Sequence, residues 1–143
     1  VLEEGRVLQA GPPAEVMARP RSPFVARLVD LNLFEGRGEG HRLLLAGGGV
    51  LRAAEPVPGR ALAAVRPQAI TLHPREPVGS PRNVWPATVR AVEPVGERTR
   101  VSLTGPVPAV AEVTAAATAD LGLAPGVELW ASLKATEVEV YPA

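Results

Sequence analysis

The sequence predicts a mainly β protein built from two related halves and preceded by a short α/β segment. Its 143 residues suffice for one ordinary domain, or for a small domain with an appendage. The 16 proline and 14 glycine residues exclude long helices over most of the chain. Valine and leucine recur between them in short runs, and this pattern favours short strands joined by turns.

Residues 1–30 differ from the rest and form the expected α/β segment. Residues 1–8 are typical of two short strands around a Glu4-Gly5 turn. A helix is expected from Gly11-Pro12-Pro13 to Pro20, and Ser22-Pro23 supplies an N-cap and a first-position proline for a second helix. Because the sequence starts within a strand pattern, we expect that it was cut from a longer protein and that residues 1–30 lack most of their packing partners.

From about residue 31 the pattern becomes β. A connection rich in proline, glycine and serine at 74–83 separates halves at about 31–75 and 80–143. One helical turn is expected at 118–123, ended by Pro125-Gly126, and the last two strands are expected to pair with each other. The predicted strands of this region are 43–45, 50–53, 60–65, 84–93, 98–104, 107–114, 128–133 and 137–141.

An internal similarity relates the two halves. Residues 59–72 resemble residues 126–140 if one residue is inserted, and Leu62 then aligns with Leu129. The same alignment matches Arg66 with Lys134 and Ile70 with Val138. Two such units predict two half-barrels, or two copies of one β module that share a core. Chance similarity between short β segments is the alternative.

Composition and missing motifs exclude several classes of function. Fifteen basic and fifteen acidic side chains, with only five aromatic residues, argue against a nucleic-acid-binding face. The chain has no cysteine and only two histidines, so no thiolate or histidine metal site is expected. It also lacks a phosphate-binding loop and a nucleophile elbow, so we expect no catalytic residue in it.

The candidate binding site consists of two short segments. The loop Ser80-Pro81-Arg82-Asn83 is rich in hydrogen-bond donors, and Lys134-Ala135-Thr136 adds a fixed positive charge after a strand. Such groups can hold a small tetrahedral oxyanion without a metal if the two segments meet, within one chain or between two. The alternative is an ordinary turn and a solvated lysine. Trp85 and Trp130 are expected in a core or interface, and His41 and His73 on the surface.

The chain resembles two consecutive parts of the importer subfamily of ABC-transporter ATPases. Residues 1–16 and 19–26 resemble the end of the ATPase domain, after all the motifs that handle ATP and magnesium. Residues 32–36 and 65–70 resemble the OB-like TOBE domain that follows it. Ser80–Asn83, 111–114, 121–126 and 131–138 occur in the same order in molybdate-binding Mop-like modules. The resemblance implies an ABC ATPase remnant at 1–30 and an OB-like TOBE/Mop barrel at 31–143.

The resemblance also implies a site. In Mop-like modules the serine-x-arginine-asparagine loop and the lysine of the last strand pair hold the oxyanion, commonly where two modules meet. Carried over, the implied ligands are Ser80, Arg82 and Lys134, followed by Asn83, Thr114 and the amide of Ala135. Some members have a hydroxyl where Ala135 stands, and Pro81 removes a backbone donor. Residues 31–75 contain no second such loop, so a site needing two complete modules would need a second chain.

The implied function is regulatory. The chain would bind molybdate or tungstate, pair with a second copy of itself, and control an importer ATPase that contacts a transmembrane permease at the cytoplasmic face of the cell membrane. It would itself hydrolyse no ATP. Two alternatives stay open: a purely structural TOBE dimerisation domain of a sulfate or sugar importer, binding no ion, and a free-standing molybdate-storage protein.

Overall fold

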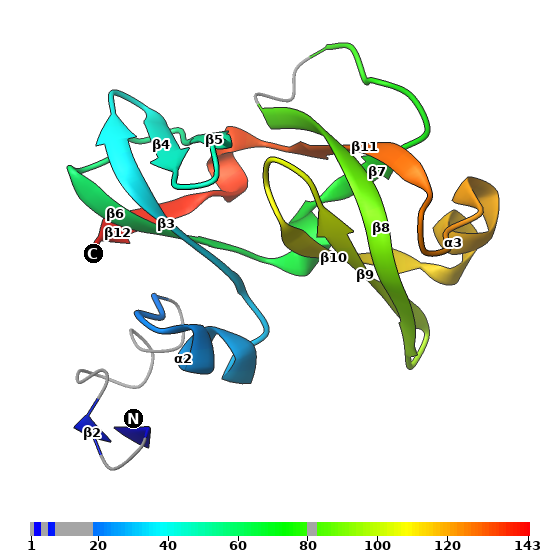
Figure 1. Ribbon diagram of the computed structural model, residues 1–143, viewed down its shortest axis with the longest axis horizontal. Coiled ribbons are helices and arrows are strands. Elements are labelled where there is room, and N and C mark those ends of the chain that lie inside the picture. Colours follow the sequence, from blue (N-terminus) through cyan, green and yellow to red (C-terminus); the bar gives the residue numbers. More distant parts are fainter. Residues whose placement is uncertain (1, 4–5, 8–18, 80–82) are drawn as a thin grey trace.

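The structure is a computed structural model that describes residues 2–3, 6–7, 19–79 and 83–143, and it confirms the mainly β prediction. Two five-stranded sheets lie side by side (Figure 1). The strands are β1 Leu2–Glu3, β2 Arg6–Val7, β3 Asn32–Glu39, β4 Arg42–Leu45, β5 Val50–Arg52, β6 Arg60–Val65, β7 Thr71–His73, β8 Asn83–Val95, β9 Arg98–Thr104, β10 Ala109–Thr114, β11 Glu128–Leu133 and β12 Glu139–Pro142. The helical elements are α2 Pro23–Leu28, α3 Ala115–Leu121 and the 3₁₀ turns η1 Pro67–Ala69 and η2 Ala135–Glu137.

Local sequence signals account for the first described elements. β1 and β2 pair antiparallel, as expected, while the Glu4-Gly5 turn and the helix expected from Gly11 lie outside the described residues. α2 begins after Ser22, whose Oγ accepts a hydrogen bond from the Val25 amide at 3.2 Å. Neither α2 nor α3 is long and apolar enough to cross a membrane, and no other helix among the described residues is either.

Each sheet is completed by a strand from the other half of the chain. The strand orders are β12-β6-β3-β4-β5 and β10-β9-β8-β11-β7. β7 leaves the first half to pair with β11, and β12 leaves the second half to pair with β6. The expectation that the last two strands pair with each other was therefore wrong, because η2 carries the chain from β11 into the other sheet (Figure 1).

The repeat between the halves is present, but the predicted alignment was wrong by one residue over the first strand. β6 and β11 have equal lengths, and Arg66 and Lys134 follow them with nearly the same backbone angles (φ −69°, ψ 136° and φ −70°, ψ 139°). No insertion is therefore needed, and Leu62 matches Trp130 rather than Leu129. The positions that face the main core agree with this offset: Ala61, Ala63 and Val65 match Leu129, Ala131 and Leu133.

The two sheets share one main core. Its buried side chains come from both halves, including Leu43 and Leu51 from the first and Val101 and Leu103 from the second. The exchanged strands contribute as well, because Leu72 of β7 belongs to this core. Neither half therefore encloses a core of its own. The connection expected at 75–80 separates the two halves in sequence, but it does not separate two hydrophobic cores.

Residues 19–30 pack against the first sheet, so this described part of the segment 1–30, expected to lack most of its packing partners, has partners within the chain. Val25 and Ala26 of α2 are buried, and the buried Tyr141 of β12 donates a hydrogen bond to the carbonyl of Pro20 at 2.5 Å. Arg19 forms an ion pair with Glu139 at 2.9 Å. Burial raises the pKa of Tyr141 to about 12, an effect that exceeds the opposing influence of the nearby arginines.

Candidate functional site

The two segments of the predicted site lie next to each other, as far as the described residues show. Leu133 at the end of β11 pairs with Asn83 at the start of β8, so Asn83 and Lys134 are neighbours across the sheet. Lys134 is exposed, and the described residues provide no carboxylate or carbonyl partner for its ammonium group. The hydroxyl residue and the charged residue of the predicted loop, Ser80 and Arg82, lie outside the described residues.

A surface pocket surrounds Lys134 and is built from both halves of the chain. Three of its lining residues are cations: Arg42, Arg52 and Lys134. Arg42 forms an ion pair with Glu39, whereas Arg52 has no such partner among the described residues. The lining residues are His41, Arg42, Arg52, Ala53, Ala54, Lys134, Ala135 and Thr136. None of these is a carboxylate, so the pocket has the charge that favours an anion.

Ala135, one of the residues predicted for the site, lines this pocket. It is the first residue of η2, so the 3₁₀ turn does not use its amide as a donor. Its carbonyl accepts a hydrogen bond from the Ala54 amide at 3.3 Å, which attaches η2 to the end of the first-half hairpin. Thr136 is exposed beside it and adds a hydroxyl group to the lining.

Asn83 is buried, and its side chain is already bonded to backbone. Its Oδ1 accepts from the Arg52 amide at 2.7 Å, and its Nδ2 donates to the Arg52 carbonyl at 2.9 Å. These two bonds connect the start of β8 to β5 of the other sheet and hold Arg52 beside the pocket. The structure therefore gives Asn83 a positioning role, since its two bonds to Arg52 engage both ends of its amide.

Replacing Asn83 by alanine should lower the free energy of unfolding by about 1–3 kcal/mol, because it removes both partly buried hydrogen bonds from the Arg52 backbone. Asn32→Ala should cost a similar amount, since Asn32 makes the same pair of bonds to Val110. Urea unfolding of both variants measures this. An unchanged midpoint for Asn83→Ala would show that its bonds to Arg52 do not hold the two sheets together.

Thr114 lies away from Lys134 within one chain. It is the N-cap of α3, and its Oγ1 accepts a hydrogen bond from the Ala117 amide at 3.1 Å. β10 places Thr114 opposite Arg98, which pairs with Val95 at the end of β8 distant from Asn83. The predicted helical turn at 118–123 is thus α3, which starts three residues earlier because Thr114 caps it and ends at Gly122, whose φ is +59°.

Three polar residues of the pocket, His41, Arg42 and Arg52, were not predicted from the sequence as site residues. His41 was expected on the surface, where it lies, but it also lines this pocket, and its Nδ1 is 3.3 Å from the Ala53 carbonyl oxygen. Arg42 and Arg52 pair across β4 and β5. A sequence signal for Arg42 and Arg52 does exist. The two arginines lie at equal distances in sequence on either side of Gly47, where a hairpin that turns at Gly47–Gly49 would pair them.

The remaining polar and aromatic predictions fall elsewhere. Trp85 is buried in the main core, and Trp130 is partly buried. Neither of them lines the Lys134 pocket. His73 contacts Ser132 Oγ through Nε2 at 2.7 Å, away from the pocket lining. Among the described residues, no group of three or more metal-ligating side chains is placed to hold a metal ion.

Comparison with known proteins agrees with this architecture. Residues 79–140 match the TOBE domain family, so this part of the chain is a TOBE domain. A solved structure of the cytoplasmic molybdate-binding protein ModG with molybdate bound superposes with a TM-score of 0.67 at 25% identity. The match covers 78% of this chain and 96% of the ModG chain. The mainly β class and its likeness to a molybdate-binding fold are thus confirmed.

The relatives that match the whole chain are importer ATP-binding subunits. The molybdenum import ATP-binding protein ModC of Mycobacterium tuberculosis is 36% identical over 100% of this chain. The molybdate/tungstate import ATP-binding protein WtpC of Pyrococcus horikoshii is 31% identical over 99% of it. The chain spans 41% of the length of each of these relatives. The resemblance to this family drawn from the sequence is therefore confirmed.

Proposed function

We propose that this chain is the oxyanion-sensing and subunit-pairing part of an importer ATP-binding subunit, and that it binds molybdate or tungstate in the Lys134 pocket. The observation that supports this most strongly is the charge of the pocket. Three cations line it, no carboxylate does so among the described residues, and Lys134 has no protein partner there. Charge-assisted hydrogen bonds from such groups are the strong ones for a doubly charged tetrahedral anion.

The proposed ligand set keeps the residues predicted from sequence, in separate roles. Lys134 and the amide of Ala135 line the pocket. Ser80 and Arg82 lie three residues and one residue before Asn83 in the sequence, and Asn83 holds the start of β8 against Arg52. Thr114 belongs to the other end of the sheet, so it would contribute only from a second copy of the chain. A homodimer is therefore part of the proposal.

The regulatory role follows from thermodynamic linkage. If the anion binds one arrangement of the paired subunits more tightly than another, rising intracellular molybdate shifts the population toward the first. The ATP hydrolysis that it controls would take place in the remaining length of the parent protein, which would contact a membrane permease from the cytoplasmic side. In this chain the proposed response is binding alone.

Isothermal titration calorimetry of the wild-type chain with molybdate, tungstate and sulfate tests the binding role. We expect heat for molybdate and tungstate, and a decrease in affinity as sodium chloride is raised, because exposed cations are screened by salt. Sodium chloride added at matched ionic strength provides the blank. If none of the three anions gives heat, the chain would be a purely structural TOBE domain.

A further inference from the structure

A second pocket is related to the Lys134 pocket by the repeat between the halves. Asn32 starts β3 and pairs with Val65 at the end of β6, as Asn83 starts β8 and pairs with Leu133 at the end of β11. Asn32 accepts from the Val110 amide at 2.8 Å and donates to the Val110 carbonyl at 2.9 Å. This is the same pair of bonds that Asn83 makes to Arg52, so Val110 occupies the position that corresponds to Arg52.

Extending these offsets along the paired strands matches the two pockets residue by residue. Four of the five differences remove a donor or a positive charge from the second pocket, or add a carboxylate to it, and the fifth replaces a cation that has no partner by one that has. In the second pocket, Arg66 with its ion-pair partner takes the place of Lys134. Pro67, which has no N–H group, takes the place of Ala135, whose amide is a free donor. The pairs, Lys134 pocket first, are Lys134 and Arg66, Ala135 and Pro67, Arg52 and Val110, Ala54 and Glu112, and Arg42 and Ser102.

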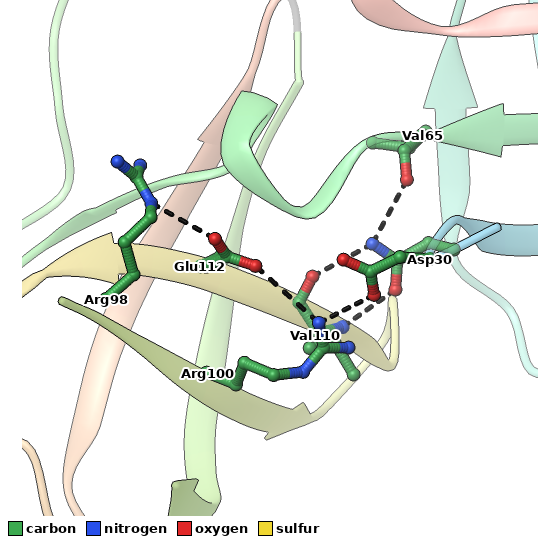
Figure 2. A network of polar contacts seen from close by, with 7 residues as sticks. Asp30, Val65, Arg98, Arg100, Val110 and Glu112 are labelled. Atoms are coloured by element: carbon green, nitrogen blue, oxygen red, sulfur yellow. Dashed lines mark hydrogen bonds and ion pairs between the residues drawn. The ribbon is translucent and has the colours of Figure 1, made fainter. Parts of the chain in front are cut away.

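Carboxylates of the chain itself already engage three cations in this region, those of Arg66, Arg98 and Arg100. Asp30 approaches Arg100 at 2.6 Å, and Glu112 lies 3.6 Å from the same guanidinium and 3.1 Å from that of Arg98 (Figure 2). Arg66 forms an ion pair with Glu137 at 3.2 Å. The Glu112 side chain is only 12% exposed, so solvent screens its charge poorly.

The hollow that remains next to this network carries less positive charge than the Lys134 pocket. Its lining contains one carboxylate, that of Asp30, and two guanidinium groups, those of Arg100 and of Arg27 in α2. Asp30 has a φ of +57°, a left-handed conformation that aspartate tolerates better than most residues, and it ends the connection between α2 and β3. In the sequence, Val29 and Leu31 stand where Ser80 and Arg82 stand relative to the second asparagine. An incoming anion would meet the Asp30 carboxylate in the lining, an Arg100 guanidinium already paired with both Asp30 and Glu112, and no such loop.

We propose that Asp30 and Glu112 occupy the second pocket as internal anions, so that each chain binds one oxyanion, at Lys134, and none at the related position. This inference rests on the proposed function, since it concerns the number of anions bound. Like charges a few ångströms apart repel strongly where solvent is partly excluded. The two pockets of the repeat therefore differ in function although they share a backbone.

Counting bound tungsten per chain tests the proposal. Equilibrium dialysis with tungstate, followed by elemental analysis, should give one tungsten per wild-type chain at saturation. Lys134→Ala should leave no site of wild-type affinity, because no second site compensates, and a dialysis series over tungstate concentration shows this. Two tungsten atoms per wild-type chain, or a site of wild-type affinity left in Lys134→Ala, would overturn the inference. Absence of binding to wild type would instead refute the proposed function.

A gain-of-binding variant tests the role of the two carboxylates directly. Asp30→Asn with Glu112→Gln, placed in the Lys134→Ala background, keeps the side-chain shapes and should restore a weak, salt-sensitive site. Glu35→Gln with Glu128→Gln in the same background changes the net charge equally at exposed positions and should restore nothing. Circular dichroism confirms that each variant is folded. A folded Asp30/Glu112 variant that binds no more than this control contradicts the proposal.

Discussion

Lys134→Ala weakens tungstate binding by roughly 10- to 100-fold in our expectation, whereas Arg66→Ala leaves it nearly unchanged. A hydrogen bond to a charged group contributes about 1.5–3 kcal/mol, and 1.4 kcal/mol corresponds to a factor of ten. Lys134 has no protein partner among the described residues, so the variant loses only what the ammonium group gives the anion. Calorimetric titration with tungstate measures the change.

The repeat makes Arg66 a well-matched control for Lys134. Both residues precede a 3₁₀ turn and have nearly equal φ and ψ, but Arg66 already forms an ion pair with Glu137. Both side chains are exposed, so neither replacement should shift the midpoint of thermal unfolding by much. Lys134→Arg keeps the charge and should recover most of the affinity. Equal losses for Lys134→Ala and Arg66→Ala would show that the anion, if bound, is bound elsewhere.

Local pattern was sufficient to predict most of the strands. The alternation of buried and exposed residues in β9 and the turn residues on either side of it fixed its bounds at 98–104. The Ser22-Pro23 cap located α2 for the same reason, since the signal lies within four residues. α3 was placed three residues too late because the alanines that open it carry no amphipathic pattern, and only the Thr114 cap marks its start.

Long-range pairing could not be predicted in the same way. β7 and β12 are short strands of ordinary β pattern, and nothing in their residues indicates that each crosses to the other sheet. The one-residue error in the repeat has a related cause. Apolar residues fill both faces of β6, so Leu62 on the second face looked as suitable a partner for Leu129 as Ala61 on the main core face.

The candidate site was predictable in part for the same reasons. Lys134 and the loop before Asn83 stood out because their residue types bind anions, and the pairing of β8 with β11 brings Asn83 next to Lys134. Arg52 and the positioning role of Asn83 depend on a contact between β5 and β8, which are separated by thirty residues or more in sequence and lie in different sheets. Such a contact leaves no periodic signal in a single sequence.

Tyr141→Ala should lower the free energy of unfolding by about 3–5 kcal/mol, the range for removing a large buried ring. Tyr141 is 1% exposed and packs with Leu62 in a small cluster outside the main core. The guanidinium carbon atoms of Arg19 and Arg21 lie 5.5 and 5.9 Å from its ring centre. The variant should therefore also loosen residues 19–21, and trypsin should cleave after Arg21 faster than in wild type.

Tyr141→Phe separates the contribution of the ring from that of the hydroxyl group. It keeps the packing but leaves the Pro20 carbonyl without its hydrogen bond, at a cost of about 1–3 kcal/mol. The pKa of Tyr141 is raised in the fold from 10.0 to about 12, so folding favours the protonated phenol. The corresponding stability is present in full below pH 10 and is lost as the pH rises toward 12. The Phe variant lacks this loss, and urea unfolding at pH 9 and pH 11 compares the two proteins.

The two Tyr141 variants also test how the N-terminal segment is attached. β12 completes the first sheet through β6, and its Tyr141 and Glu139 hold Pro20 and Arg19. One exchanged strand therefore joins the two halves and fixes the segment that leads into them. If Tyr141→Ala lost stability while cleavage after Arg21 stayed at the wild-type rate, α2 alone would anchor the segment through Val25 and Ala26. Faster cleavage in step with lost stability is the result that the contacts of β12 predict.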